Sequence, residues 1–272
     1  MIVVDRSYTT NAGGEIMLTQ SVGTGSFVDI VASGYFNRQT LLRSANERQF
    51  NLWPQTSTSG LTEQLTQELV YTAPGNSPGG VGLPLGGAPL SRIDPAITRL
   101  AVVAPTLTLV SSGVTAIAVA SGRLTAATGG QVMYQPDLLG GDGRIEIVVD
   151  PSSLPSGSSA SANATYNSLG YIIGGRVTLR DGACLTSICD IRVPRSNGVT
   201  IVRTLVHEMG HLLGFNHTVS NSVMNGGCST PGCTVNLDSR IEDFNAAEKL
   251  LVKLMLERRV GNRFPDNDRN SI

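Results

Sequence analysis

Charged residues are scarce in this chain of 272 residues, since Asp, Glu, Lys and Arg together make up 15% and the formal net charge is −1. No cluster of lysine and arginine is dense enough to attract a nucleic acid or an anionic membrane, so we expect neither as a partner. No apolar run approaches the roughly 20 residues that a membrane-spanning helix needs. The composition therefore argues against a nucleic-acid-binding protein and against a helical membrane protein.

A signal peptide is also missing, because Met1-Ile2-Val3-Val4-Asp5 is too short an apolar run. The four cysteines form two close pairs, Cys184 with Cys189 and Cys228 with Cys233. An even number in short loops favours two local disulfides, which persist in oxidising compartments. We therefore expect a secreted, periplasmic or cell-surface protein whose targeting segment lies outside this sequence. Two alternatives stay open: four cysteines permit three pairings, and their thiolates could instead hold a second zinc ion.

Histidine is rare too, and all three histidines fall within eleven residues, at His207, His211 and His217. Residues four apart on a helix lie about 6 Å apart along its axis and nearly on one face, so His207 and His211 can ligate one metal ion. Gly214 can adopt the left-handed conformation that ends a helix, and a turn there would bring His217 to the same ion. Three nitrogen ligands leave the fourth zinc position open for water, as in catalytic sites, and Glu208 lies beside it.

The segment from His207 to His217 reads His-Glu-x-x-His-x-x-Gly-x-x-His and resembles the signature of the metzincin clan of zinc endopeptidases. Members of that clan have a methionine-containing turn after the motif, and Met224 lies seven residues after His217. Within the clan the chain is most similar to bacterial matrixin-like secreted proteases, with Thr218 where many matrixins have serine. Gly226 stands where astacins and serralysins have a tyrosine, so no tyrosine ligand is expected.

The resemblance implies a secreted zinc endopeptidase in which Glu208 takes a proton from zinc-bound water as that water attacks a peptide carbonyl. We expect a monomer that acts on a protein or peptide substrate. The substrate is expected to lie extended along an edge strand and to form main-chain hydrogen bonds with it. That strand is expected at Arg176, Val177, Thr178 and Leu179. Two other functions stay open: a non-catalytic binding or adhesion module stabilised by zinc, and a zinc amidase or deacetylase.

Glycine and proline divide the chain into regions. Residues 1–70 alternate apolar and polar side chains and predict a small β-rich, sandwich-like domain. Its segment from Val31 to Thr40 is similar to carboxypeptidase-regulatory-like modules, although a generic β-hairpin fits it as well. Residues 71–92 hold too much glycine and proline for a regular element and predict a linker. Residues 93–262 are interpreted as the zinc metallopeptidase domain, and residues 263–272 as a disordered tail.

The resemblance implies an α+β catalytic domain: a twisted, mostly parallel sheet with two long helices and a C-terminal helix. Hydrophobic patterns predict strands at 97–104, 131–135, 144–149 and 176–180. A helix with a face of small residues is predicted from the spacing of Val114, Ile117, Ala118, Ser121, Leu124 and Ala127.

Local signals place the ends of the other helices. Asn197 or Thr200 is expected to cap the helix of the histidine motif. Ser239 to Glu242 has capping-box spacing and predicts the start of the C-terminal helix, with an apolar stripe at Ile241, Phe244, Leu251 and Leu254. The charged run Glu257 to Arg259 near its end is expected to be solvated.

Three further features carry smaller predictions. No motif supports a structural calcium ion (Ca2+), because the tail from Pro265 to Asn270 lacks the glycine and the closing glutamate of a calcium loop. The loop from Asn225 to Leu237 lies where matrixin-like enzymes shape the pocket for the residue after the scissile bond. Trp53, the only tryptophan, is predicted to pack against the neighbouring domain rather than to stack on a ligand.

Overall fold

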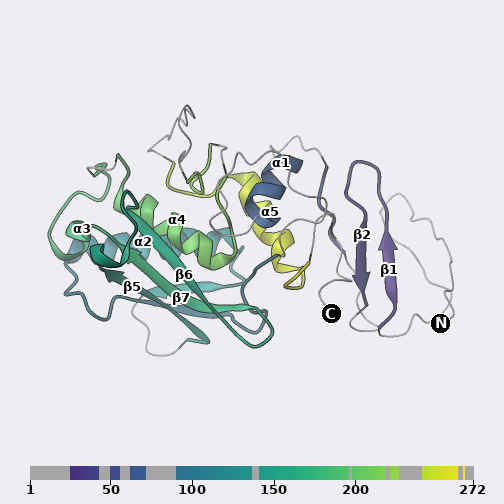
Figure 1. Cartoon of the computed structure of the whole chain (residues 1–272), viewed down its shortest axis with the longest axis horizontal. Coiled ribbons are helices and arrows are strands. Elements are labelled where there is room, and N and C mark those ends of the chain that lie inside the picture. Colours follow the sequence, from purple (N-terminus) through teal and green to yellow (C-terminus); the bar gives the residue numbers. More distant parts are fainter. Residues whose placement is uncertain are drawn as a thin grey trace.

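A five-stranded sheet forms the centre of the protein (Figure 1). The computed structural model describes residues 25–42, 50–55, 62–71, 90–136, 141–195, 198–218, 221–226, 241–262 and 266. The strands of the sheet are β3 (Arg99–Val103), β4 (Met133–Pro136), β5 (Gly143–Val149), β6 (Ala160–Tyr166) and β7 (Ile172–Leu179). Their order is β4-β3-β5-β7-β6, and only β6 runs antiparallel to its neighbour. The prediction of an α+β fold with a mostly parallel sheet is therefore confirmed.

Two helices, α2 (Ser111–Ala127) and α4 (Ile201–Leu213), pack against this sheet. The same part of the chain also contains α3 (Ala183–Thr186), α5 (Ala246–Leu256) and a short 3-10 turn at Pro151–Ser153. α2 is the crossover that parallel strands β3 and β4 require, and it packs on β4 and on α4. α4 in turn packs on β6 and β7, which fixes the helix of the histidine motif against the sheet. No helix in the described ranges is long and apolar enough to cross a membrane.

Most of the predicted face of α2 is buried. Val114 and Ala118 are exposed, whereas the buried members of that face are Ile117, Ser121, Leu124 and Ala127. Gly113, which the prediction did not include, is also buried. It lies directly against the backbone of Leu185 in α3, where even a methyl group would overlap it.

The strand β7 is longer than predicted and is not an edge strand. The predicted strand was 176–180, but β7 begins at Ile172 and includes Gly174 and Gly175. A Cβ atom on Gly175 would lie 2.7 Å from Cδ2 of Leu212, so the missing side chain lets β7 approach α4 closely. The edge-strand expectation for Arg176 to Leu179 is wrong, because β7 is paired with β5 on one side and with β6 on the other. The edge strands are β4 and β6, and the sequence analysis predicted no strand at β6, Ala160–Tyr166.

The C-terminal helix α5 also begins later than predicted. Its capping box consists of Asn245 and Glu248, not of the segment Ser239 to Glu242. Glu242 instead accepts a hydrogen bond from the hydroxyl of Thr200 and pairs with Arg123 at 2.9 Å. These partners lie far away in the sequence, and they hold Glu242 outside the helix.

The N-terminal region contains a hairpin of β1 (Phe27–Ile30) and β2 (Arg38–Leu41), paired antiparallel. It lies at the end of the molecule opposite α3 (Figure 1). The predicted sandwich also includes residues 1–24 and 43–49, which lie outside the described ranges.

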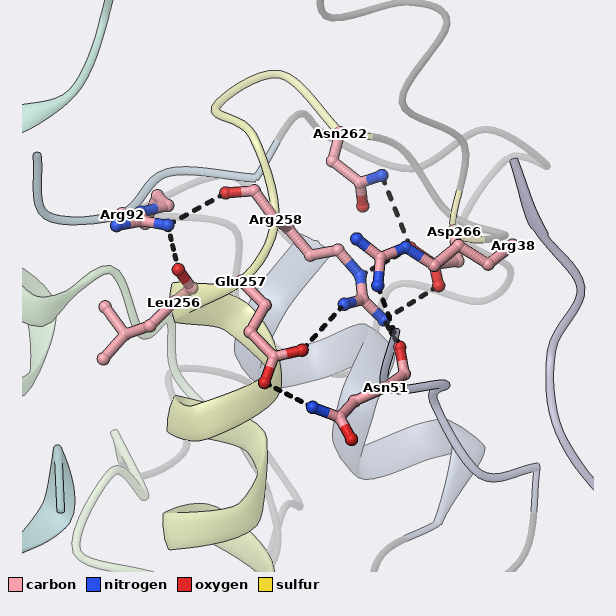
Figure 2. Close-up of polar contacts among 8 residues, drawn as sticks. All are labelled: Arg38, Asn51, Arg92, Leu256, Glu257, Arg258, Asn262 and Asp266. Carbon is pink, nitrogen blue, oxygen red and sulfur yellow. Dashed lines mark hydrogen bonds and ion pairs between the residues drawn. The ribbon is translucent and has the colours of Figure 1, made fainter. Parts of the chain in front are cut away.

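Polar contacts join this region to the end of α5 (Figure 2). The guanidinium of Arg258 is completely buried: it pairs with both oxygens of Asp266 at 2.7 and 2.9 Å and donates to the carbonyl of Asn51 at 2.8 Å. It also stacks over the ring of Trp53, 4.9 Å from its centroid. The packing prediction for Trp53 is confirmed. The expectation of solvation is wrong for Arg258, and Asp266, within the tail expected to be disordered, is buried.

A further segment precedes the predicted linker. It consists of α1 (Glu63–Thr66) and a π-helical turn (Gln67–Tyr71), and it buries Leu65, Leu69 and Val70 in the main hydrophobic core. Its last residues therefore pack in the same core as the five-stranded sheet.

The first cysteine pair forms a disulfide, Cys184 to Cys189, with 5.3 Å between the Cα atoms. This pairing agrees with the prediction. Cys228 and Cys233 lie outside the described residues, as does nearly all of the loop from Asn225 to Leu237.

Candidate metal centre

The helix α4 carries two of the three histidines and has well-defined ends. Thr200 is the N-cap, one of the two predicted caps, and its hydroxyl accepts a hydrogen bond from the backbone N–H of Arg203 at 3.1 Å. Gly214 ends the helix in the left-handed region with φ of 117°, as predicted. The chain then turns back and brings His217 to the helix face that bears His207 and His211.

The three Nε2 atoms meet at one point. The distance from His207 to His211 is 3.2 Å, and His217 lies 3.1 Å from each of them. Zinc–nitrogen bonds of 2.0–2.1 Å in a tetrahedral site would set two ligand nitrogens about 3.3 Å apart. The spacing of the triad therefore fits a single small metal ion.

The protonation state of the rings also favours a cation between them. Nδ1 of His207 donates to the carbonyl of Val223, and Nδ1 of His211 donates to that of Phe215, both at 2.8 Å. Burial, with the neighbouring imidazoles, lowers the pKa of His207 well below 6.5 and lowers that of His211 to about 4. Burial lowers the pKa of His217 as well. Neutral rings that donate from Nδ1 point Nε2 lone pairs at one another, which is unfavourable unless a cation lies between them.

The turn containing Met224 supports the triad from below. Met224 is completely buried, and its Sδ lies where a side chain on Gly210 would be, so the glycine lets the turn contact α4. The hydroxyl of Ser222 accepts from the N–H of Met224 at 2.8 Å and donates to the carboxylate of Glu248. Glu248 also accepts from the N–H of Asn245 at 2.7 Å. The capping box of α5 thus holds the turn that supplies the acceptor for His207.

Sequence reasoning did not identify Ser222 or Glu248 as part of the centre. The capping-box spacing of Asn245 and Glu248 was a usable signal for Glu248. Burial raises the pKa of Glu248, although its hydrogen bonds with Ser222 and Asn245 act in the opposite direction.

Glu208 lies next to His207 on α4 and is 7% exposed. Within the described part of the chain its carboxylate accepts no protein hydrogen bond. Burial raises its pKa from 4.5 to about 8. The group is therefore a buried carboxylate beside the triad that is able to take up a proton near neutral pH.

The four residues expected to bind substrate are not assembled into this centre. Val177 and Leu179 are completely buried, and Thr178 is nearly so. Arg176 is more exposed and pairs with Glu146 of β5 at 3.1 Å. The side chains of this strand serve the core and the sheet surface.

Comparison with models of known protein families found no match, and comparison with curated proteins found no significant relative. Any functional assignment therefore depends on the residues of the centre themselves.

Proposed function

We propose that the chain is a zinc endopeptidase of the metzincin type. The observation that carries this proposal is the convergence of three Nε2 atoms, 3.1–3.2 Å apart, beside a buried Glu208. A carboxylate that is neither a ligand nor hydrogen-bonded to the described protein is costly to bury. Proton transfer in a hydrolytic reaction accounts for its position.

Zinc suits the donor set. Imidazole nitrogen binds zinc, copper, iron and nickel, and three histidines with an open fourth position are an arrangement of catalytic zinc sites. When bound there, the ion supplies Lewis acidity that activates water and polarises a carbonyl group. The carbonyls of Val223 and Phe215 keep His207 and His211 in the tautomer whose Nε2 is free to bind the ion.

Glu208 performs the proton transfers in this scheme. A carboxylate oxygen of Glu208 takes a proton from the attacking water as the new C–O bond forms at the peptide carbonyl. The same oxygen then gives the proton to the amide nitrogen as the C–N bond breaks. One water is consumed, and the carboxylate is regenerated.

The edge strand β6 is the main-chain surface on which we expect an extended peptide to bind. In the described sheet its second side has no strand partner, and its first side pairs with β7, which packs on α4. A peptide added to this edge would form main-chain hydrogen bonds that do not depend on its sequence. Export from the cytosol is proposed on the basis of the disulfide between Cys184 and Cys189, because such bonds persist in oxidising compartments.

The test combines metal analysis with a variant of the base. The purified protein should contain one zinc ion per chain and hydrolyse casein, and phenanthroline should abolish hydrolysis until zinc is added back. Glu208→Gln should lose about 100- to 10,000-fold in rate while its zinc content is unchanged. Glu146→Gln makes the same chemical change on the sheet surface and should behave as wild type.

Other outcomes distinguish the remaining functions. A zinc-loaded protein that hydrolyses small acyl amides but not casein would be an amidase or deacetylase. Zinc without hydrolysis of either substrate would indicate a binding module. A Glu208→Gln variant with undiminished casein hydrolysis would contradict the assignment of the base.

A further inference from the structure

The third ligand is held differently from the other two. His207 and His211 are fixed by α4 and by hydrogen bonds from their Nδ1 atoms. Nδ1 of His217 has no such acceptor among the described residues, and His217 lies in the loop after the helix. Its position therefore depends on what restrains the main chain on either side of it.

Both neighbours of His217 are bound by the π-helical turn Gln67–Tyr71, which follows α1. The carbonyl of Leu69 accepts from the N–H of Asn216 at 2.9 Å and from its side-chain Nδ2 at 3.2 Å. The carboxylate of Glu68 accepts from the hydroxyl of Thr218 at 2.5 Å. We call these four residues the third-ligand clamp: Glu68, Leu69, Asn216 and Thr218. About 150 residues of chain separate its two halves, so only the tertiary fold assembles it.

The segment that supplies the clamp is itself well anchored. Leu69 and Thr66 are completely buried, and the hydroxyl of Thr62 accepts from the N–H of Leu65 at 3.1 Å at the start of the helix. Thr218 is completely buried on the loop side. Water therefore cannot readily replace Glu68 as the acceptor for the hydroxyl of Thr218, and loss of that acceptor removes a buried hydrogen bond.

Contacts from the methionine turn also restrain the loop. The N–H of Thr218 donates to the carbonyl of Met224 at 3.2 Å, and Gly226 lies against the imidazole of His217. Among the described residues, the loop is thus held between the turn and the clamp. Removal of the clamp would take away the restraint on its own side of His217.

We propose that Glu68 and Leu69 are positioning residues for His217, so that the metal centre extends to residues 62–71, outside the catalytic domain expected at 93–262. This inference rests on the proposed metal-binding function. Residues that orient a metal ligand from outside its coordination shell are typically worth about 10- to 100-fold in metal affinity. We expect loss of the clamp to weaken metal binding by a factor of this size.

The test measures Zn2+ affinity of the full chain by competition with a chromophoric chelator, together with the visible spectrum of the Co2+ form. Glu68→Ala should bind Zn2+ about 10- to 100-fold more weakly and change the Co2+ spectrum, because the third nitrogen is displaced. Glu68→Gln keeps an acceptor oxygen for Thr218 and should restore most of the affinity. Two controls, Glu146→Gln and the core variant Ile145→Val, test charge and stability, and both should bind as wild type.

Loop variants keep the experiment decisive if Glu68→Ala folds poorly. Thr218→Ser retains the hydroxyl and should bind normally, whereas Thr218→Val should weaken Zn2+ binding. Adding Glu68→Ala to Thr218→Val should cause little further loss, since both changes remove one interaction. Wild type that binds no metal would overturn the proposed function. Wild type that binds metal, with Thr218→Val and Glu68→Ala equal to it in affinity and spectrum, would overturn the clamp alone.

Discussion

Nε of Arg258 lies 2.7 Å from Oδ1 of Asp266, and neither side chain is exposed to solvent. Because the pair is buried, loss of one partner leaves a charge without compensation in a medium of low dielectric constant. Asp266→Ala is therefore expected to lower the free energy of unfolding by about 3–5 kcal/mol, measured by urea denaturation.

The exposed pair of Lys249 and Asp243, at 3.1 Å, provides the control for this prediction. Asp243→Ala should cost less than about 1 kcal/mol, because solvent screens the interaction. Equal losses from Asp266→Ala and Asp243→Ala would contradict the burial of the first pair and with it the docking of the residue 266 region onto α5.

Gly226 is expected to tolerate no side chain. A Cβ atom there would lie 2.5 Å from Cγ of His217, and an imidazole ring cannot yield as a flexible side chain can. Gly226→Ala should displace the third ligand and weaken Zn2+ binding by about 10- to 100-fold, measured by chelator competition. Gly122→Ala on the exposed face of α2 meets no atom within 4 Å and should leave affinity unchanged. Normal affinity in Gly226→Ala would show that the ring lies elsewhere in solution.

Ser222 connects the methionine turn to α5 through two hydrogen bonds, with Met224 and Glu248. Ser222→Ala removes the hydrogen-bond partner of the buried N–H of Met224 and that of Oε1 of Glu248. A loss of about 1–3 kcal/mol in the free energy of unfolding is expected. Ser153→Ala, in an exposed turn, should cost under about 0.5 kcal/mol in the same urea titration. If the two variants unfold at the same urea concentration, Ser222 does not support the turn.

In the metal-free protein, the contribution of His211 to stability should be lost as the pH falls. Burial lowers the pKa of His211 from 6.5 to about 4 in the folded state, so the folded protein binds fewer protons than the unfolded chain between these values. The stabilising contribution is therefore complete above pH 6.5 and is lost as the pH falls through about 4. We expect a decrease on the order of 1–3 kcal/mol for this histidine, measured by urea unfolding in a chelating buffer.

The variant that isolates this effect is His211→Gln, which removes the titrating ring. Its stability should depend less steeply on pH between 6.5 and 4 than that of the metal-free wild type. An identical slope in the two proteins would mean that His211 titrates normally in the folded state.

Several failures of sequence reasoning share one cause. The capping-box spacing of Ser239 to Glu242 was a valid local pattern, but Glu242 is engaged by Thr200 and Arg123 from other parts of the chain. The charge of Arg258 suggested a solvated side chain, but Asn51 and Trp53, some 200 residues away, enclose it. Local patterns cannot report partners that the fold brings from a distance.

The sequence analysis failed to identify β6 as an edge strand for a related reason. The strand β6 reads Ala-Ser-Ala-Asn-Ala-Thr-Tyr, a composition of weak β-propensity, so its pattern gave no strand signal. The strongly β-forming β7 was taken for the edge instead. Which strand lies at an edge is a matter of strand order, and strand order is set by long-range pairing.

By itself, the sequence determined the spacing of the metal triad. A spacing of four residues is close to one turn of an α-helix and places His207 and His211 on one face, and a left-handed glycine at Gly214 reverses the chain. Both features follow from backbone geometry within a few residues. Only the tertiary structure decided what holds His217 in place and that β6 lies at an edge of the sheet. Hydrogen bonds between segments 150 residues apart form only after the core has brought those segments together.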